Sequence, residues 1–414
     1  MQTFTTSRML GFSYFYIINS LHLMNFNLIL ALTLLISACS RSGDTAVTAP
    51  VVNTPIVIPP ITDTVYVGDG SSNLTISGNY KSGTLIIVKP GVYNKGGGIT
   101  LEQLSNVSVQ LNGVILDGLS QTKDGFYNVL FLNKLNNVSV FGGTTQYNGY
   151  RMMYISGQCK NVIFSNHSFI NNNEGIFFSA GVKWDGTDAT LGLHNFAIRN
   201  CNFTNCGNSI IGNSMDQATG TVNDLVKNFE ISGCKWKGGN PGTAMYFPAV
   251  DSAMVFNNTI DSVNMNMTND NRIFLFIGTA EFYNNTANIY QGHVAGLWSV
   301  SFGTKPKTSH FYKNTCNGSL KYSAFEFQEF AIYKIPGKTT YGDLEVTGNT
   351  CSNLNTQKHT GFDANFIDNY EYGIMGGKVS VKDNIGRNFF AAPAPGVFWN
   401  LAKPSVVSGN TYQQ

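Results

Sequence analysis

The sequence predicts an all-β protein built as a single-stranded right-handed parallel β-helix, a solenoid of about 10–12 coils. Three observations predict it: a composition suited to strands and tight turns, a short phrase that recurs along the chain, and Asn at one phase of that phrase. Glycine accounts for 43 of the 414 residues and aromatic residues for 13%. Gly, Asn and β-branched residues are poor helix formers, so this mixture favours many short strands.

The recurring phrase starts with an apolar residue, usually has Asn, Gly or Asp third, has Asn, Cys or His fourth, and usually ends on an apolar residue or Cys. Its copies occupy residues 164–169, 198–203, 231–236, 255–260, 282–287, 311–316, 346–351, 381–386 and 407–412. One such unit is too small to bury its own apolar face. Stacking the units as coils, with strands about 4.8 Å apart, makes one continuous core.

The fourth position of the phrase is expected to form a column through the stack. Its members are His167, Cys201, Cys234, Asn258, Asn285, Asn314, Asn349, Asn384 and Asn410. Asn side chains at equal phase can pass amide hydrogen bonds from coil to coil. Asn also tolerates the left-handed backbone conformation of tight turns. An antiparallel sandwich is the alternative architecture, and the regular coil spacing argues against it.

Two copies of the phrase, Val346–Thr350 and Val407–Thr411, and the apolar opening Leu85–Tyr93 resemble the pectin-lyase-like right-handed parallel β-helix superfamily. The resemblance covers roughly residues 63–414 and implies that fold. Superfamily members that cut polysaccharides usually do so on one long face of the helix. The polygalacturonase-like signatures are incomplete here, the pectate-lyase-like Arg-x-Pro-x-x-Arg pattern is absent, and no Asp-Asp pair occurs. The resemblance therefore predicts a fold and leaves the activity open.

The N-terminal residues predict an exported lipoprotein. Residues 28–36 are apolar apart from Thr33 and run into Ile36-Ser37-Ala38-Cys39. This run is too short to span a bilayer and is typical of a signal peptide. The residues before Cys39 resemble the bacterial lipobox, which implies cleavage and acylation of Cys39. An ordinary signal peptide, or an anchor helix with an incidental Cys39, is the alternative.

The predicted organisation is a signal peptide over residues 1–39, a Pro-rich tether over 40–62 and the β-helix over 63–414, with Met24 as a second candidate start. We expect a monomer lipid-anchored to a bacterial membrane, either the outer membrane or the cell surface. A formal net charge of +2 gives no electrostatic signature of nucleic-acid binding.

Candidate site residues come from the strand that follows each Asn turn. Strand residues alternate in and out, so the apolar positions of Phe325–Gln328 leave Glu326 and Gln328 facing outward. By the same alternation, Tyr246 and Trp298 are expected beside Glu326 as an aromatic row. Sugar rings pack their C–H faces on such rows, so the sequence predicts a polysaccharide groove. Scattered surface aromatics are the alternative interpretation.

Charged residues near this row suggest two chemistries. Asp270 and Arg272 suit a lyase, which needs a base and a cation beside a uronate carboxylate. Asp270 is also a candidate ligand for Ca²⁺. Glu326 with Asp363 is the candidate carboxyl pair of a glycoside hydrolase. His293 follows Gly292 as a fragment of one superfamily motif and is a candidate substrate contact. Polar turns and solvated loops are the alternatives.

Cys201 with Cys234, and Cys316 with Cys351, share a phase on neighbouring coils, which suits either disulfides or small buried thiols. The sequence thus predicts a β-helix lipoprotein that binds, and in one version cleaves, a polysaccharide as a lyase or glycoside hydrolase. The alternatives are non-catalytic glycan binding or adhesion, and a structural β-helix.

Overall fold

The computed structural model describes residues 55–94, 98–118, 129–211, 214–359, 365–368, 376–390 and 406–413. They belong to one compact unit, Asn53–Gln414. Their regular structure is β-strand apart from two short 3₁₀ helices, η1 (Asp188–Thr190) and η2 (Ala331–Tyr333). Within these ranges no helix has the length and apolarity needed to cross a bilayer. The expected signal peptide and Cys39 lie outside the described residues.

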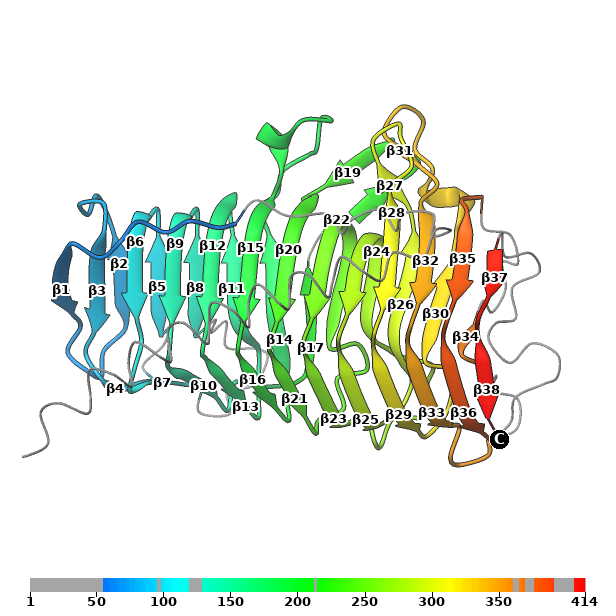
Figure 1. Ribbon diagram of the computed structural model, residues 1–414. Helices are drawn as coiled ribbons and strands as arrows, with labels where there is room; N and C mark the ends of the chain where they lie inside the picture. Colours follow the sequence, from blue (N-terminus) through cyan, green and yellow to red (C-terminus); the bar gives the residue numbers. More distant parts are fainter. Residues whose placement is uncertain are drawn as a thin grey trace, which may run out of the picture. The chain divides into compact units, whose positions relative to one another are not determined.

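Each coil contributes strands to three faces, which Figure 1 shows as successive strands stacked in chain order. Face I contains β2 (Leu74–Ser77), β5 (Ile99–Glu102), β8 (Leu130–Asn133), β11 (Arg151–Ser156), β14 (Glu174–Ser179), β17 (Asn208–Ile211), β26 (His293–Ser299), β30 (Phe325–Gln328) and β34 (Ile367–Asp368). Face II contains β1 (Asp63–Val67), β3 (Thr84–Val88), β6 (Ser105–Gln110), β9 (Asn136–Phe141), β12 (Cys159–Ser165), β15 (Leu193–Arg199), β20 (Val226–Ser232), β28 (Thr308–Tyr312), β32 (Asp343–Thr347), β35 (Val379–Lys382) and β37 (Val406–Ser408).

Face III contains β4 (Gly91–Tyr93), β7 (Val114–Asp117), β10 (Thr144–Gln146), β13 (Ser168–Ile170), β16 (Asn202–Thr204), β21 (Lys235–Lys237), β23 (Thr259–Val263), β25 (Thr286–Tyr290), β29 (Thr315–Ser319), β33 (Thr350–Leu354), β36 (Ile385–Phe389) and β38 (Thr411–Gln413). Two long strands, β22 (Met245–Phe256) and β24 (Arg272–Tyr283), run along both face I and face II. Neighbouring strands within each face pair in parallel, for example β12 with β15. The predicted parallel β-helix is confirmed, and the twelve described strands of face III match the predicted coil number.

The third position of the phrase makes the turn from face II to face III. It has a positive φ, between 53° and 67°, in every copy. The residues are Asn166, Asn200, Gly233, Asn257, Asn284, Lys313, Gly348, Asp383 and Gly409. This left-handed conformation is open mainly to Gly, Asn and Asp, which explains the composition of the phrase. The chain therefore turns at the same phase in each coil.

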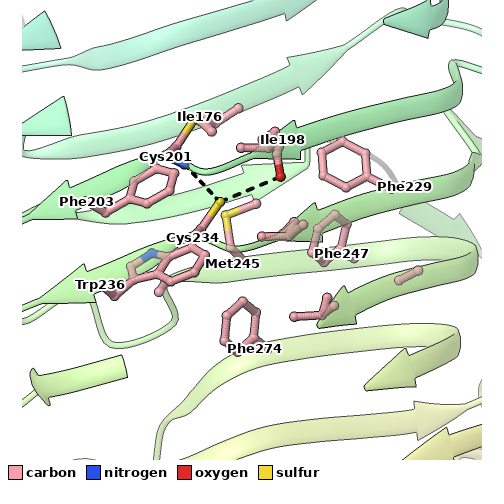
Figure 2. Close-up of a cluster of buried hydrophobic side chains, with 14 of the residues drawn as sticks. Ile176, Ile198, Cys201, Phe203, Phe229, Cys234, Trp236, Met245, Phe247 and Phe274 are labelled. Atoms are coloured by element: carbon pink, nitrogen blue, oxygen red, sulfur yellow. Dashed lines mark hydrogen bonds between the residues drawn. The ribbon is translucent and has the colours of Figure 1, made fainter. Parts of the chain in front are cut away.

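The fourth position forms the predicted buried column. From Asn258 to Asn410, the side-chain amide of each Asn donates to the carboxamide oxygen of the next, with N···O distances of 2.9–3.0 Å. Each amide also bonds a backbone carbonyl, as Asn314 does with Phe282 at 2.8 Å. Before Asn258 the column changes chemistry, and the backbone N–H of Cys201 donates to Cys234 Sγ at 3.4 Å (Figure 2).

Inward side chains fill the coils with a single apolar core, which includes stacked Phe rings on neighbouring coils such as Phe196 and Phe229. Figure 2 shows Cys201 and Cys234 within this core among Phe203, Trp236 and their neighbours. The six cysteines of the described residues are buried free thiols. The pairs that suited either disulfides or thiols are therefore thiols here.

A second apolar cluster lies outside the coils. It gathers Trp184, Leu191, Val222, Leu225, Ala249, Ile277, Val300, Phe302 and Ile335. These residues come partly from insertions that carry the hairpin β18 (Ser214–Asp216)–β19 (Thr221–Asn223) and the pair β27 (Ser301–Phe302)–β31 (Thr339–Thr340). Figure 1 shows β19, β27 and β31 together at one edge of the helix. Tyr246, Trp298 and Tyr333 pack against this cluster, so it flanks part of face I.

Candidate functional site

One column of residues in register runs along face I from coil to coil. Register pairs Phe131 with Tyr154, Tyr154 with Phe177, Phe177 with Ile210 and Ile210 with Tyr246. The column continues through Leu275, Gly296, Glu326 and Asp368. Aromatic residues therefore occupy the first part of this column and carboxylates its last part. Its members Phe131, Tyr154, Phe177 and Glu326 point outward from the strands, since none belongs to the apolar core.

A charged cluster surrounds the end of this column. Arg272, at the start of β24, places Nη2 2.8 Å from Asp270 Oδ2 and in contact with Glu326 Oε2 on β30. β26 lies between these two strands and carries Gly296 at the crossing point. A Cβ atom at Gly296 would lie 2.7 Å from Arg272 Cγ. The absence of a side chain at Gly296 is thus what lets Arg272 lie across the coil.

His293 is fully buried beneath the two carboxylates. Ser323 Oγ donates its proton to the Phe325 carbonyl at 2.8 Å, so it can only accept from His293, whose Nδ1 lies 2.8 Å away. His293 Nε2 then faces Asp270 Oδ1 at 3.1 Å and Glu326 Oε2 at 3.5 Å. His293 Nε2 has no hydrogen-bond partner among the described residues, so we describe both contacts as ion pairs of the protonated imidazole.

Glu326 is also fully buried, on the side of β30 opposite to Phe325 and Phe327, which pack in the apolar core. Arg272 covers Oε2, and Oε1 accepts from Gln328 Nε2 at 2.6 Å and from Trp298 Nε1 at 3.5 Å. Trp298 in turn stacks on Tyr333 with ring centroids 6.0 Å apart. Glu326 therefore holds the side chains of Arg272, Gln328 and Trp298 in position. The side chains of Asp270 and Arg272 are 37% and 17% exposed.

The pKa values in the cluster favour ionised groups. Burial alone raises the pKa of Asp270, but contact with His293 and the charge of Arg272 outweigh it, and the pKa lies below its ordinary value. Burial lowers the pKa of His293, yet Asp270 and Glu326 together raise it above its ordinary value. For Arg272, the charges of Glu326, Asp270 and Asp368 overcome burial and raise the pKa. The carboxylates of Asp270 and Glu326 thus favour the charged forms of Arg272 and His293.

The predicted calcium ligand Asp270 belongs to a set of three side chains, with His293 and Glu326, whose ligand atoms lie within 4.8 Å of one another. Calcium takes six to eight oxygen ligands, and this set offers two carboxylates and an imidazole. Arg272 Nη2 already contacts both carboxylates and supplies a positive charge there. The set does not fit calcium, and the cluster is a network of ion pairs.

The structure brings together six of the predicted site residues: Asp270, Arg272, His293, Trp298, Glu326 and Gln328. Tyr246 shares the outward column but is separated from Glu326 by Leu275 and Gly296, and it packs on the second apolar cluster. Asp363 lies outside the described residues. His293 and Gln328, predicted to contact substrate, are buried and contact the carboxylates instead.

Sequence reasoning missed Gly296 and Ser323, because their roles depend on side chains from neighbouring coils. It also missed a second ionisable group on face II, where His310 Nδ1 lies 2.6 Å from Glu281 Oε1. Burial lowers the pKa of His310 but the two flanking glutamates raise it overall. His310 and Glu281 each immediately precede a copy of the phrase, at 311–316 and 282–287. This shared position on neighbouring coils was the sequence feature that could have predicted the pair.

The chain is similar to several solved structures. The A-module of a mannuronan C-5 epimerase from Azotobacter vinelandii is 12% identical, with 85% of this chain and 91% of that chain covered and a TM-score of 0.39. The tailspike protein of E. coli bacteriophage HK620 is 14% identical, with 80% and 59% covered and a TM-score of 0.40. A family 28 exopolygalacturonase from Yersinia enterocolitica is 11% identical, with 85% and 71% covered and a TM-score of 0.35.

At these identities the likeness concerns the fold alone. No protein-family model matches the chain, and no curated protein matches its sequence. The chain is a parallel β-helix, as its sequence predicted.

Proposed function

We propose that this protein binds a polysaccharide along face I. One observation carries the proposal: an outward column that begins as stacked aromatic rings ends at a charged cluster that reaches the surface through Asp270 and Arg272. Rings offer apolar contact to sugar C–H groups, and the carboxylate and guanidinium accept from and donate to hydroxyl groups. A linear glycan lying along the helix axis meets both features in turn.

Burial argues against glycoside hydrolysis at Glu326. Hydrolysis needs two carboxyl groups that reach opposite sides of a scissile bond. Glu326 is fully buried, and both of its oxygens already accept bonds from Arg272, Gln328 and Trp298. We therefore propose that Glu326 has a structural role and holds Arg272 in place, instead of the hydrolytic role with Asp363 that the sequence suggested.

A second candidate function is polysaccharide cleavage by β-elimination, favoured by the exposed carboxylate of Asp270 beside Arg272. Arg272 would stabilise the negative charge that develops on a uronate carboxylate, and Asp270 would accept the adjacent proton. The lowered pKa of Asp270 makes it a weak base, which would slow that step. Binding without fast turnover is the function that this geometry supports best.

We also propose that the protein is exported and attached to a bacterial membrane through a lipid on Cys39. The apolar run before Cys39 supports export, and Cys39 supports attachment to a bacterial membrane through lipid. Growth with a radiolabelled fatty acid tests it: the protein should take up label and sediment with membranes, and the Cys39→Ser variant should do neither. Equal labelling of that variant would contradict lipidation at Cys39.

The function is tested by screening the purified full chain against acidic and neutral polysaccharides, with and without calcium. Affinity electrophoresis reports binding, the ultraviolet absorbance of unsaturated products reports elimination, and new reducing ends without absorbance report hydrolysis. We expect retardation by an acidic polysaccharide and no dependence on calcium. New absorbance that is lost in Asp270→Asn would establish the lyase activity, and the absence of retardation by every glycan would refute the proposal.

A further inference from the structure

A hollow of about 220 Å³ lies on face I, several coils before the charged cluster. Arg151, Glu174, Phe177 and Asn208 line it, together with Tyr150. A water molecule takes up roughly 30 Å³ of liquid volume, so the hollow has room for a small cyclic group. It is separate from the site at Asp270 and shares with it only the outward surface of face I.

Aromatic rings hold the guanidinium of Arg151 in this hollow. Arg151 Cζ lies 3.6 Å from the centroid of the Phe177 ring, 4.7 Å from that of Tyr150 and 5.2 Å from that of Tyr154. Phe131, Tyr154 and Phe177 stack on successive coils with centroids 5.3 and 5.4 Å apart. Such contacts keep a cation at a partly apolar surface, where hydrogen bonds from it are stronger than in water.

The hollow repeats the chemistry of the charged cluster. Each has one arginine with a carboxylate nearby: Glu174 is the register partner of Arg151, and Asp270 pairs with Arg272. In both arginines the Nε–H is buried and makes no hydrogen bond. Each guanidinium group therefore has one donor that no described protein group uses.

The two arginines also face the same way along the helix. β11, which carries Arg151, is four strand steps from β24, which carries Arg272, through β14, β17 and β22. Four spacings amount to about 19 Å, which is several sugar units of an extended chain. The other described arginines lie elsewhere, since Arg199 is bound in a bidentate pair to Glu230 on face II and Arg387 is exposed on face III.

We propose that the hollow at Arg151, Glu174 and Phe177 is a second sugar subsite, which takes a carboxylate-bearing sugar of the same chain that binds at Asp270 and Arg272. This inference rests on the proposed function and adds to it a substrate class and a minimum chain length. The planar fork of a guanidinium matches a carboxylate in two parallel hydrogen bonds, so a uronate suits both arginines better than a neutral sugar.

The test measures affinity against ligand length by isothermal titration calorimetry on the full chain. The ligands are galacturonate oligosaccharides sorted by length from the disaccharide upward, with glucose oligosaccharides as neutral controls. We expect the affinity of the wild type to rise by about tenfold or more once the oligomer spans both subsites. Arg151→Gln should abolish that rise and leave short oligomers unaffected, and Arg387→Gln should behave as wild type.

The outcomes separate this subsite from the proposed function itself. If the wild type binds oligomers without a step in affinity, or if the step survives in Arg151→Gln, the subsite is refuted while glycan binding on face I stands. Equal affinity for glucose oligosaccharides would overturn the uronate assignment. If no oligosaccharide or polysaccharide binds at all, the subsite and the proposed function both fail.

Discussion

Arg272 on β24 reaches Glu326 on β30 by lying across Gly296 of the intervening strand β26. The contact joins two coils that are not neighbours. It also fixes which groups reach the surface, because Arg272 covers Glu326 and leaves Asp270 exposed. The geometry of the candidate site therefore depends on one residue without a side chain.

We expect Gly296→Ala to displace Arg272 and destabilise the fold by about 1–3 kcal/mol, since the new Cβ would overlap Arg272 Cγ. Urea unfolding measures this change. The control is a double-mutant cycle: in an Arg272→Ala background the Gly296→Ala substitution should have little further effect. Equal costs in both backgrounds would mean that Gly296 is needed for some reason other than Arg272.

Glu326→Gln should destabilise the protein by about 3 kcal/mol, because it removes the charge of a fully buried carboxylate that pairs with the partly buried Arg272. The matched control is Glu345→Gln, whose side chain is 38% exposed. That change should cost less than about 0.5 kcal/mol. Chemical unfolding of both variants decides the point, and similar small costs would show that the Arg272–Glu326 pair contributes little.

The stability contributed by His293 should depend on pH. Its folded-state pKa is raised above the ordinary 6.5, so the folded protein binds the imidazole proton more tightly than the unfolded chain. That contribution is complete below 6.5 and is lost as pH rises through the raised pKa. The stability difference between wild type and His293→Gln should therefore shrink as pH rises above 6.5.

The stability difference between wild type and Asp270→Asn, measured over the same pH range, should change in the opposite direction. The pKa of Asp270 is lowered, so its contribution is present above its ordinary pKa and is lost as pH falls through the folded value. A difference for His293→Gln that stays constant, or grows toward high pH, would contradict the ion-pair network.

The buried Asn column should make a large contribution to stability. Asn314→Ala leaves the Phe282 carbonyl and the Asn285 amide groups without their partners in the core. We expect a loss of about 3 kcal/mol in thermal or urea unfolding. Asn202→Ala, at an exposed position of β16, is the control and should change stability by less than about 0.5 kcal/mol.

The fold was predictable because its physical cause repeats along the chain. The left-handed turn at the third position of each phrase restricts that position mainly to Asn, Gly or Asp, and the column beside it favours Asn. Strand alternation puts Glu326 on the side of β30 opposite to the core residues Phe325 and Phe327. The left-handed turn repeats in nine copies of the phrase and keeps the coils in register. In that register Arg272 is the strand partner of His293.

The site was predictable only in part, because its arrangement depends on contacts between coils. Alternation shows that Glu326 points outward and not that Arg272 buries it from two strands away. Ser323 gives no sequence signal for its bond to His293, since the two lie 30 positions apart. Tyr246 was expected beside Glu326, yet their shared column separates them by Leu275 and Gly296.

The most direct test of glycan binding on face I is affinity electrophoresis of the full chain through gels that contain an acidic polysaccharide such as polygalacturonate. The wild type and Arg387→Gln should be retarded equally. Asp270→Asn/Arg272→Gln and Arg151→Gln should each migrate faster, because each removes a charged contact from face I. Retardation that is the same in all four proteins would contradict binding along this face.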